Sequence, residues 1–233
     1  MANARAPDTR LLVISGLKRE AAIFERRGVL SICGNADTLR LKLDRAAGLP
    51  IELVVSFGIC GGLDPKLRSG DLVIGSEVVS GAERLVARED LSRGLERCLT
   101  DAGERVVRGR IAAVVTPVMN VQAKAELRVA TDALAVDMES EIAARFADAR
   151  GLPFVILRAV SDTAKRNLPA LVAHAVSTEG EVDTVAVFAA LIRSPGQLAG
   201  TIAAARDSTG ALRSLRRCCG VACVFLGLGP AQL

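Results

Sequence analysis

Short apolar segments that alternate with helix-like segments constrain the fold of this chain more than any other feature of its sequence. The segment Ile51–Phe57 is apolar along most of its length, a pattern typical of a strand that is buried on both faces. Such strands occur in parallel sheets that helices cover on either side. The sequence therefore predicts an α/β fold, a single domain with a mixed, mostly parallel central sheet flanked by helices.

The predicted elements follow one another between residues 11 and 192. The predicted strands are Leu11–Ser15, Val29–Cys33, Ile51–Phe57, Asp71–Ile74, Arg110–Thr116, Leu134–Val136 and Phe154–Ala159. The predicted helices are Arg19–Arg27, Asp37–Ala47, Lys124–Ala130, Glu139–Ala149 and Val182–Ile192, and Gly58–Gly62 is predicted to form a turn. Because no repeat or low-complexity linker precedes Pro195, we expect one domain over residues 1–195 and a C-terminal tail over residues 196–233.

Composition argues against several classes of protein. The formal charge of +4 is spread along the chain, and Tyr and Trp are absent, which disfavours binding to nucleic acid. The six cysteines lack the spacing of a zinc site and the only histidine is His174, so we expect no metal. The first apolar run is too short for a signal peptide and no run is long enough to span a membrane, so we expect a cytoplasmic protein.

Chemically suggestive residues follow four of the predicted strands. Glu20 comes after the first strand, and the glycine-rich segment SFGICGGLDP continues the third. Asp137-Met138-Glu139 and Ser161-Asp162 follow two later strands. Each feature alone has an ordinary explanation as a cap, a turn or a solvated residue. Because ligands of such sheets bind at the carboxyl ends of the strands, the four together predict one site.

Two longer segments carry a resemblance to a known family. VVSFGICGGLDPKLRSGDLVIGSEVV and AVDMESEIAARFADARGLPFVILRAVSD resemble the two signatures of the purine nucleoside phosphorylase and nucleosidase superfamily, in the same order and with similar spacing. The resemblance covers about residues 11–192. Only 13 residues separate Glu20 from Gly34, and this short front half is most similar to the hopanoid-associated branch, which acts on adenosylhopane. Adenosylhopane is a membrane triterpenoid joined to adenosine.

The resemblance implies a role for the residues that follow the later strands. Asp162 corresponds to the general acid that protonates N7 of adenine, and Ser161 would orient its carboxylate or cap a helix. Glu139 would accept hydrogen bonds from the ribose hydroxyls, and Met138 would pack its thioether against the sugar. Asp137 is expected to support the structure or the pocket wall. Arg158 is left open as an ion-pair partner on the same strand.

The resemblance also bears on the nucleophile. Nucleosidases of the superfamily place a water-activating Glu where the phosphorylases place a phosphate-binding Arg, and this chain has Glu20 there. Hydrolysis is therefore favoured, although the neighbouring Lys18 and Arg19 leave phosphorolysis open. Ile59 stands where relatives have Ser or Thr. The backbone of Gly58, Ile59, Cys60 and Gly61 is then left to hold the nucleophile.

The base pocket departs most from the family pattern. The segment that stacks on adenine in relatives corresponds to Val118-Met119-Asn120-Val121, in which Asn120 replaces the aromatic residue. Backbone groups of Val121 are expected to read the edge of the base instead.

The function implied is an N-ribosyl hydrolase that releases adenine from a small-molecule or lipid-linked nucleoside with a large apolar 5′ substituent. The alternatives are a methylthioadenosine or S-adenosylhomocysteine nucleosidase, phosphorolysis of the same bond, and an inactive nucleoside- or lipid-binding protein. No cofactor is implied, and the resemblance predicts a homodimer.

The tail allows two interpretations. Its first part has an amphipathic helical pattern with arginines along the flank, and Val221–Leu228 is almost wholly apolar. A basic amphipathic helix of this kind could lie peripherally on the inner membrane, from which a lipid substrate would be drawn. Alternatively, the tail packs on the domain or on a partner subunit.

Overall fold

The computed structural model describes residues 10–169, 177–181 and 198–228. Its eight-stranded sheet has the order β2-β1-β3-β7-β6-β4-β5, and β8 pairs with both β3 and β4. The strands are β1 (Leu11–Ser15), β2 (Val29–Cys33), β3 (Leu53–Gly62), β4 (Leu72–Ser80), β5 (Glu83–Val86), β6 (Val106–Ala113), β7 (Ala135–Asp137) and β8 (Phe154–Asp162). Pairings of β1 with β2 and β3, of β3 with β8, and of β6 with β4 and β7 are parallel, whereas β3–β7, β4–β8 and β4–β5 are antiparallel. The predicted α/β class with a mixed central sheet is confirmed.

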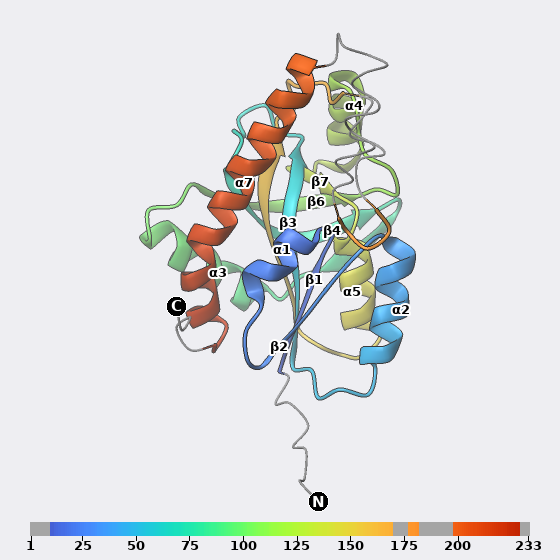
Figure 1. Ribbon diagram of the computed structural model, residues 1–233, viewed down its shortest axis with the longest axis vertical. Helices are drawn as coiled ribbons and strands as arrows, with labels where there is room; N and C mark the ends of the chain where they lie inside the picture. The colour runs from blue at the N-terminus through green and yellow to red at the C-terminus, as the bar shows by residue number, and fades with distance from the viewer. Residues whose placement is uncertain (1–9, 170–176, 182–197, 229–233) are drawn as a thin grey trace, which may run out of the picture.

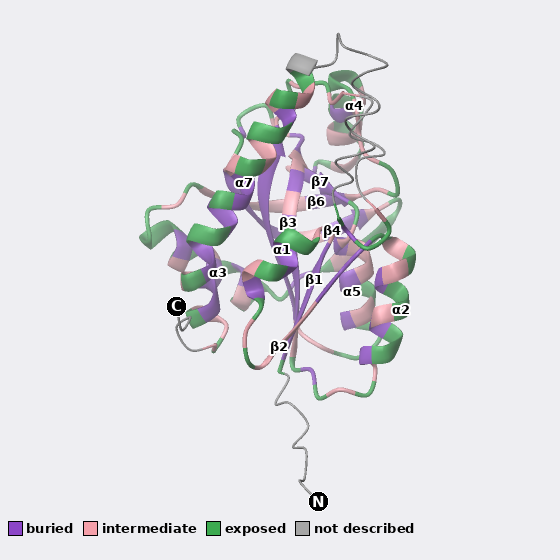
Figure 2. Ribbon diagram, in the orientation of Figure 1, coloured by how far each residue is buried: buried purple, intermediate pink, exposed green. Residues whose placement is uncertain are grey.

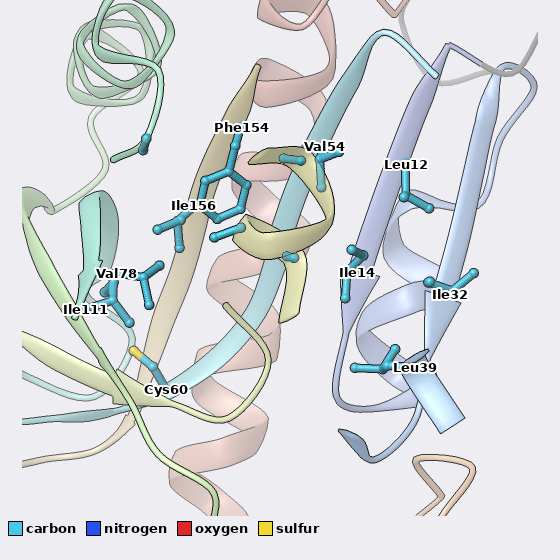
Figure 3. Packing of buried hydrophobic residues seen from close by; sticks show 14 of the residues in the cluster. Leu12, Ile14, Ile32, Leu39, Val54, Cys60, Val78, Ile111, Phe154 and Ile156 are labelled. Atoms are coloured by element: carbon cyan, nitrogen blue, oxygen red, sulfur yellow. The ribbon is translucent and has the colours of Figure 1, made fainter. Parts of the chain in front are cut away.

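Helices cover both faces of this sheet (Figure 1). They are α1 (Lys18–Ala21), the 3-10 helix η1 (Ala22–Phe24), α2 (Ala36–Ala46), α3 (Glu89–Asp101), α4 (Val121–Thr131), α5 (Ser140–Asp148) and α7 (Leu198–Phe225). Alternate residues of β1 face opposite sides, because side chains alternate along a strand. Leu12 and Ile14 pack with Leu39 of α2 (Figure 3), and Leu11 and Val13 belong to the cluster that α3 and α7 cover.

The predicted turn at Gly58–Gly62 is wrong, because β3 continues through all five residues to Gly62. The glycines permit close approach rather than a chain reversal. A Cβ at Gly58 would lie 2.7 Å from the carboxylate carbon of Glu20, and one at Gly61 would lie 3.1 Å from Val136. At these two glycines the strand therefore brings its backbone close to β7 and to the residues after β1.

Other predicted boundaries need correction. The strand expected at Arg110–Thr116 is β6, which starts four residues earlier, at Val106, and ends three residues earlier, at Ala113. Arg108 and Arg110, polar residues within it, are ion-paired with Glu89 and Glu77. Both β5 and α3 were missed. Gly94 weakens the helical pattern of α3, and a Cβ there would lie 2.4 Å from the ring of Phe225. The helix expected at Val182–Ile192 lies outside the described residues.

The C-terminal helix α7 packs against the sheet. This arrangement agrees with the second interpretation of the tail, in which it packs on the domain. Its inward face contributes Ala211, Leu212, Leu215, Cys218, Cys219, Ala222 and Cys223 to the same buried cluster as Leu95 and Leu99 of α3. Figure 2 shows buried residues along this helix alternating with exposed ones. Residues 198–225 are therefore part of the α/β domain rather than a separate tail. Within the described residues, every helix, α7 included, is too short or too polar to cross a membrane.

This packing predicts a large effect of truncating Leu215. Its side chain is fully buried between α7 and the sheet, so Leu215→Ala should lower the free energy of unfolding by about 2–5 kcal/mol. Val224 on the outer side of the helix is 58% exposed, and Val224→Ala should change stability by less than about 0.5 kcal/mol. Chemical denaturation measures both. Equal, small effects would mean that α7 does not belong to the core.

Candidate functional site

A pocket of about 320 Å³ lies at the carboxyl ends of β1, β3 and β8, beside β7. All four sequence features that were expected to converge contribute residues to it. The predicted site residues that line it are Glu20, Ile59, Cys60, Gly61, Met138, Glu139, Ser161 and Asp162. Gly58 lies behind Glu20 instead of lining the pocket.

Glu20 is held by main-chain hydrogen-bond donors. Its Oε2 accepts hydrogen bonds from the amides of Gly16 (3.0 Å) and Leu17 (2.8 Å), and its Oε1 accepts one from Ile59 (2.7 Å). Burial raises the pKa of this carboxyl, while the charge of Arg158 and the three amides oppose that rise. A carboxylate has about four acceptor positions, so one remains on Oε1 for a further donor.

Arg158 joins the two carboxylates that flank Met138. Its Nε lies 2.7 Å from Asp137 Oδ2 and its Nη1 lies 3.2 Å from Glu139 Oε2, with the whole guanidinium buried. Asp137 also accepts hydrogen bonds from the amide and hydroxyl of Ser140 at the start of α5. Asp137 is thus engaged in structural contacts and also lines the pocket. Glu139 keeps Oε1 close to Gly16, where a Cβ would approach it to 2.5 Å.

The environment of Glu139 favours its neutral form. Burial raises the pKa of Glu139 to about 7, the negative charges of Asp137 and Glu20 add to that rise, and Arg158 opposes it. This carboxyl therefore titrates near neutral pH, beside the buried carboxylate of Glu20.

Asp162 is held at both oxygens. Its Oδ1 accepts a hydrogen bond from Ser161 Oγ at 2.7 Å, and its Oδ2 lies 2.5 Å from Nζ of Lys124, which is fully buried. Sequence reasoning missed Lys124 as part of the site. One feature of the sequence could have indicated it. A lysine in the first turn of a helix is unfavourable beside the positive end of the helix dipole, so Lys124 needs a partner elsewhere.

Asn120 and Val121 are placed differently from the expectation. The side chain of Asn120 caps α4 by accepting a hydrogen bond from Ala123 N at 2.8 Å. The amide of Val121 donates to Asn167 Oδ1 at 2.9 Å, so it is not free to read a base. Neither residue lines the pocket. The nearby wall is apolar instead, formed by Val114, Pro117, Val118 and Leu168.

The described residues contain no group of three or more His, Cys, Asp or Glu side chains that could hold a metal ion. Cys60 lines the pocket, and burial raises the pKa of its thiol. The charged groups of the site are carboxyl groups with an arginine and a lysine behind them.

The raised pKa of Glu139 predicts a pH dependence of stability. The folded protein holds a proton on Glu139 up to about pH 7, whereas the unfolded chain releases it near 4.5, so stability falls as the pH rises between these values. Glu139→Gln stays neutral. The difference in free energy of unfolding between this variant and wild type should therefore shift in favour of the variant by on the order of 1–3 kcal/mol as the pH rises from 4.5 to 8. Denaturant titrations at each pH measure this difference. Glu141→Gln, in the first turn of α5 and outside the pocket lining, is the matched control.

Comparison with known proteins agrees with this arrangement. The profile of the Phosphorylase superfamily matches residues 27–193. The 5′-methylthioadenosine/S-adenosylhomocysteine nucleosidase of Marinomonas sp. (strain MWYL1) is 28% identical over 137 residues, which are 51% of this chain and 59% of that relative. The match thus spans a little over half the length of the relative.

Solved structures share the fold. The corresponding nucleosidase of Neisseria meningitidis, in complex with methylthio-immucillin-A, has a TM-score of 0.69 at 18% identity, covering 94% of this chain and 99% of that one. The S-adenosylhomocysteine nucleosidase of Streptococcus pyogenes, in complex with 5-methylthiotubericidin, has a TM-score of 0.61 at 15% identity, covering 92% and 99%. Since the superfamily profile covers most of the chain and the fold agrees with it, this chain belongs to the Phosphorylase superfamily.

Proposed function

We propose that this protein hydrolyses the N-ribosyl bond of an adenine nucleoside that carries a large apolar 5′ substituent, as in adenosylhopane, and so serves hopanoid lipid biosynthesis. The observation that carries the proposal is the convergence of Glu20, Glu139 and Asp162 on one pocket. Each of the three has a different partner, namely backbone amides, Arg158 and Lys124.

Cleavage of an N-ribosyl bond passes through a state in which the sugar carries positive charge. Carboxylates beside the sugar stabilise this charge, as they do in glycosidases. Glu139 binds the ribose hydroxyls in this proposal, with Met138 against the sugar. Asp162 gives its proton to N7, so that adenine leaves as a neutral base.

Glu20 supports water over phosphate as the nucleophile. Three converging amides form a cradle that would suit a phosphate oxygen, but the carboxylate of Glu20 already occupies it. Lys18, which left phosphorolysis open, pairs with Glu181 at 2.8 Å. A phosphate would have to displace the carboxylate of Glu20 from the amides and compete with the carboxylate of Glu181 for Lys18. The remaining acceptor position on Oε1 suits one water molecule.

The apolar wall supports an apolar substituent on the nucleoside. Val114, Pro117, Val118 and Leu168 offer hydrocarbon surface and no charge. Methylthioadenosine also ends in a small apolar group, and the names of the relatives favour a methylthioadenosine or S-adenosylhomocysteine nucleosidase as the second candidate.

A homodimer and a peripheral contact with the membrane belong to the same proposal. Because the apolar face of α7 is buried, the contact would use its outward face. Arg206, Arg213 and Arg216 are exposed there, and Ile202 is 44% exposed. Basic and apolar residues together favour binding to an anionic bilayer surface.

The choice of nucleophile is tested with labelled water. In ¹⁸O-water the sugar product should carry the label at C1, and added phosphate should not accelerate release of adenine. Glu20→Gln should lose at least about 100-fold in rate, because an amide NH₂ would face the amides that now donate to the carboxylate. Glu25→Gln, an exposed neighbour, is the matched control. Ribose 1-phosphate as the main product would identify a phosphorylase instead.

The substituent is tested with adenosines that carry 5′ alkylthio chains of increasing length. Each methylene buried against the apolar wall contributes about 0.8 kcal/mol, so kcat/KM should rise roughly fourfold per methylene until the wall is covered. A maximum at the methylthio compound, with decline for longer chains, would favour the second candidate. Adenine release measured by absorbance serves for the whole series.

A further inference from the structure

Lys124 is a buried cation whose donors are all used. It comes from the first turn of α4, and its Nζ donates to the carbonyl oxygens of Thr163 (2.9 Å) and Arg166 (3.0 Å) as well as to Asp162 Oδ2. Three acceptors match the three hydrogens of an ammonium group, so the charged form of Lys124 is fully satisfied. The contact fastens α4 to the segment that follows β8.

That segment is held from other directions too. The amide of Leu168 donates to Met119 O at 2.7 Å, and Arg166 pairs with Asp207 of α7 at 2.5 Å. Lys124 therefore acts on a segment that is already fixed in place, and its specific contribution is the positive charge beside Asp162.

The other ionisable groups near Asp162 do not offer it a second cation. Cys60 on β3 interacts electrostatically with Asp162, and the other pocket residues Asp137, at the end of β7, and Glu139, just after it, are acidic. Arg158 on β8 is committed to those two carboxylates. Among the described residues, Lys124 is thus the cation in ion-pair contact with Asp162.

Ser161 can serve Asp162 in either protonation state. Its hydroxyl lies 2.7 Å from Asp162 Oδ1 and 3.1 Å from Cys60 O, although it has one hydrogen to donate. When Asp162 is ionised, the hydroxyl donates to it. When Asp162 is protonated, the hydrogen can turn to the Cys60 carbonyl, and the hydroxyl oxygen can accept.

We propose that Lys124 is a positioning residue that holds Asp162 and sets the pH above which the enzyme loses its acid. This inference rests on the proposed function. In that reaction the Asp162 O–H bond breaks as N7–H forms, and the C1′–N9 bond breaks with its electron pair passing to the base. Water adds to C1′ and gives its proton to Glu20. A cation stabilises the charged form of a carboxyl group beside it, so removing the charge of Lys124 tests whether that charge governs the loss of the acid.

The test is the pH profile of adenine release by Lys124→Met. Without the cation, Asp162 should hold its proton to higher pH, so the basic limb of kcat/KM should move up by about 1–3 pH units. Lys124→Arg keeps the charge and should leave the limb near its wild-type position. Lys66→Met, at an exposed site, is the matched control. Lys124→Gln, neutral but able to donate to the two carbonyls, replaces the Met variant if that variant fails to fold.

A uniform loss of rate with an unmoved limb would overturn the inference, since it would reduce Lys124 to a structural role. A limb that moves to lower pH would also overturn it, because Lys124 would then be supplying the proton. Carbon-13 NMR titration of the Asp162 carboxyl in the free protein gives a readout that does not depend on activity. Equal midpoints in wild type and variant would refute the role of Lys124. Full activity of Asp162→Asn would refute the proposed function instead.

Discussion

The buried guanidinium of Arg158 is the interaction on which the site depends. It places one positive charge among Asp137, Glu139 and Glu20, which otherwise would repel one another in a space shielded from water. It also donates to Ser56 Oγ on β3 at 2.6 Å, so it links β3, the end of β7 and β8. Removing one partner of such a buried pair typically costs about 3–5 kcal/mol, because the other charge is left uncompensated. The pocket therefore cannot be separated from the junction of these strands.

Most of the candidate site could be predicted because it follows from strand geometry. The carboxyl ends of parallel strands meet at one edge of a sheet, so Glu20 and Asp162, which follow β1 and end β8, were expected together before any contact was known. Glu139 follows β7, which is antiparallel to β3, and reaches the same pocket from the opposite strand direction. Lys124 could not be found in the same way. It reaches Asp162 from a helix 38 residues earlier in the chain, and only the tertiary packing of α4 shows this contact.

The fold was predictable in class and less so in detail, for two physical reasons. A glycine run in a sequence is consistent either with a chain reversal or with close approach of backbone, and Gly58–Gly62 proved to be the second. Likewise, an amphipathic helix shows which of its faces is buried but not what covers it. The apolar face of α7 is covered by this domain's own sheet.

The three carboxyl groups differ because each has a different class of partner. Burial raises the pKa of Glu20, and this suits a group that must receive a proton from water, while the backbone amides hold its carboxylate in place without adding a net charge. Arg158 only partly offsets the burial of Glu139, whose pKa of about 7 lets it be present near neutral pH both as a carboxylate that accepts hydrogen bonds and as an acid that donates one. Lys124 gives Asp162 a full countercharge. Environments that push similar groups toward different protonation states are how one pocket assembles acid and base functions at a single pH. In the proposed reaction, the partner of each carboxyl group therefore matters as much as the carboxyl group itself.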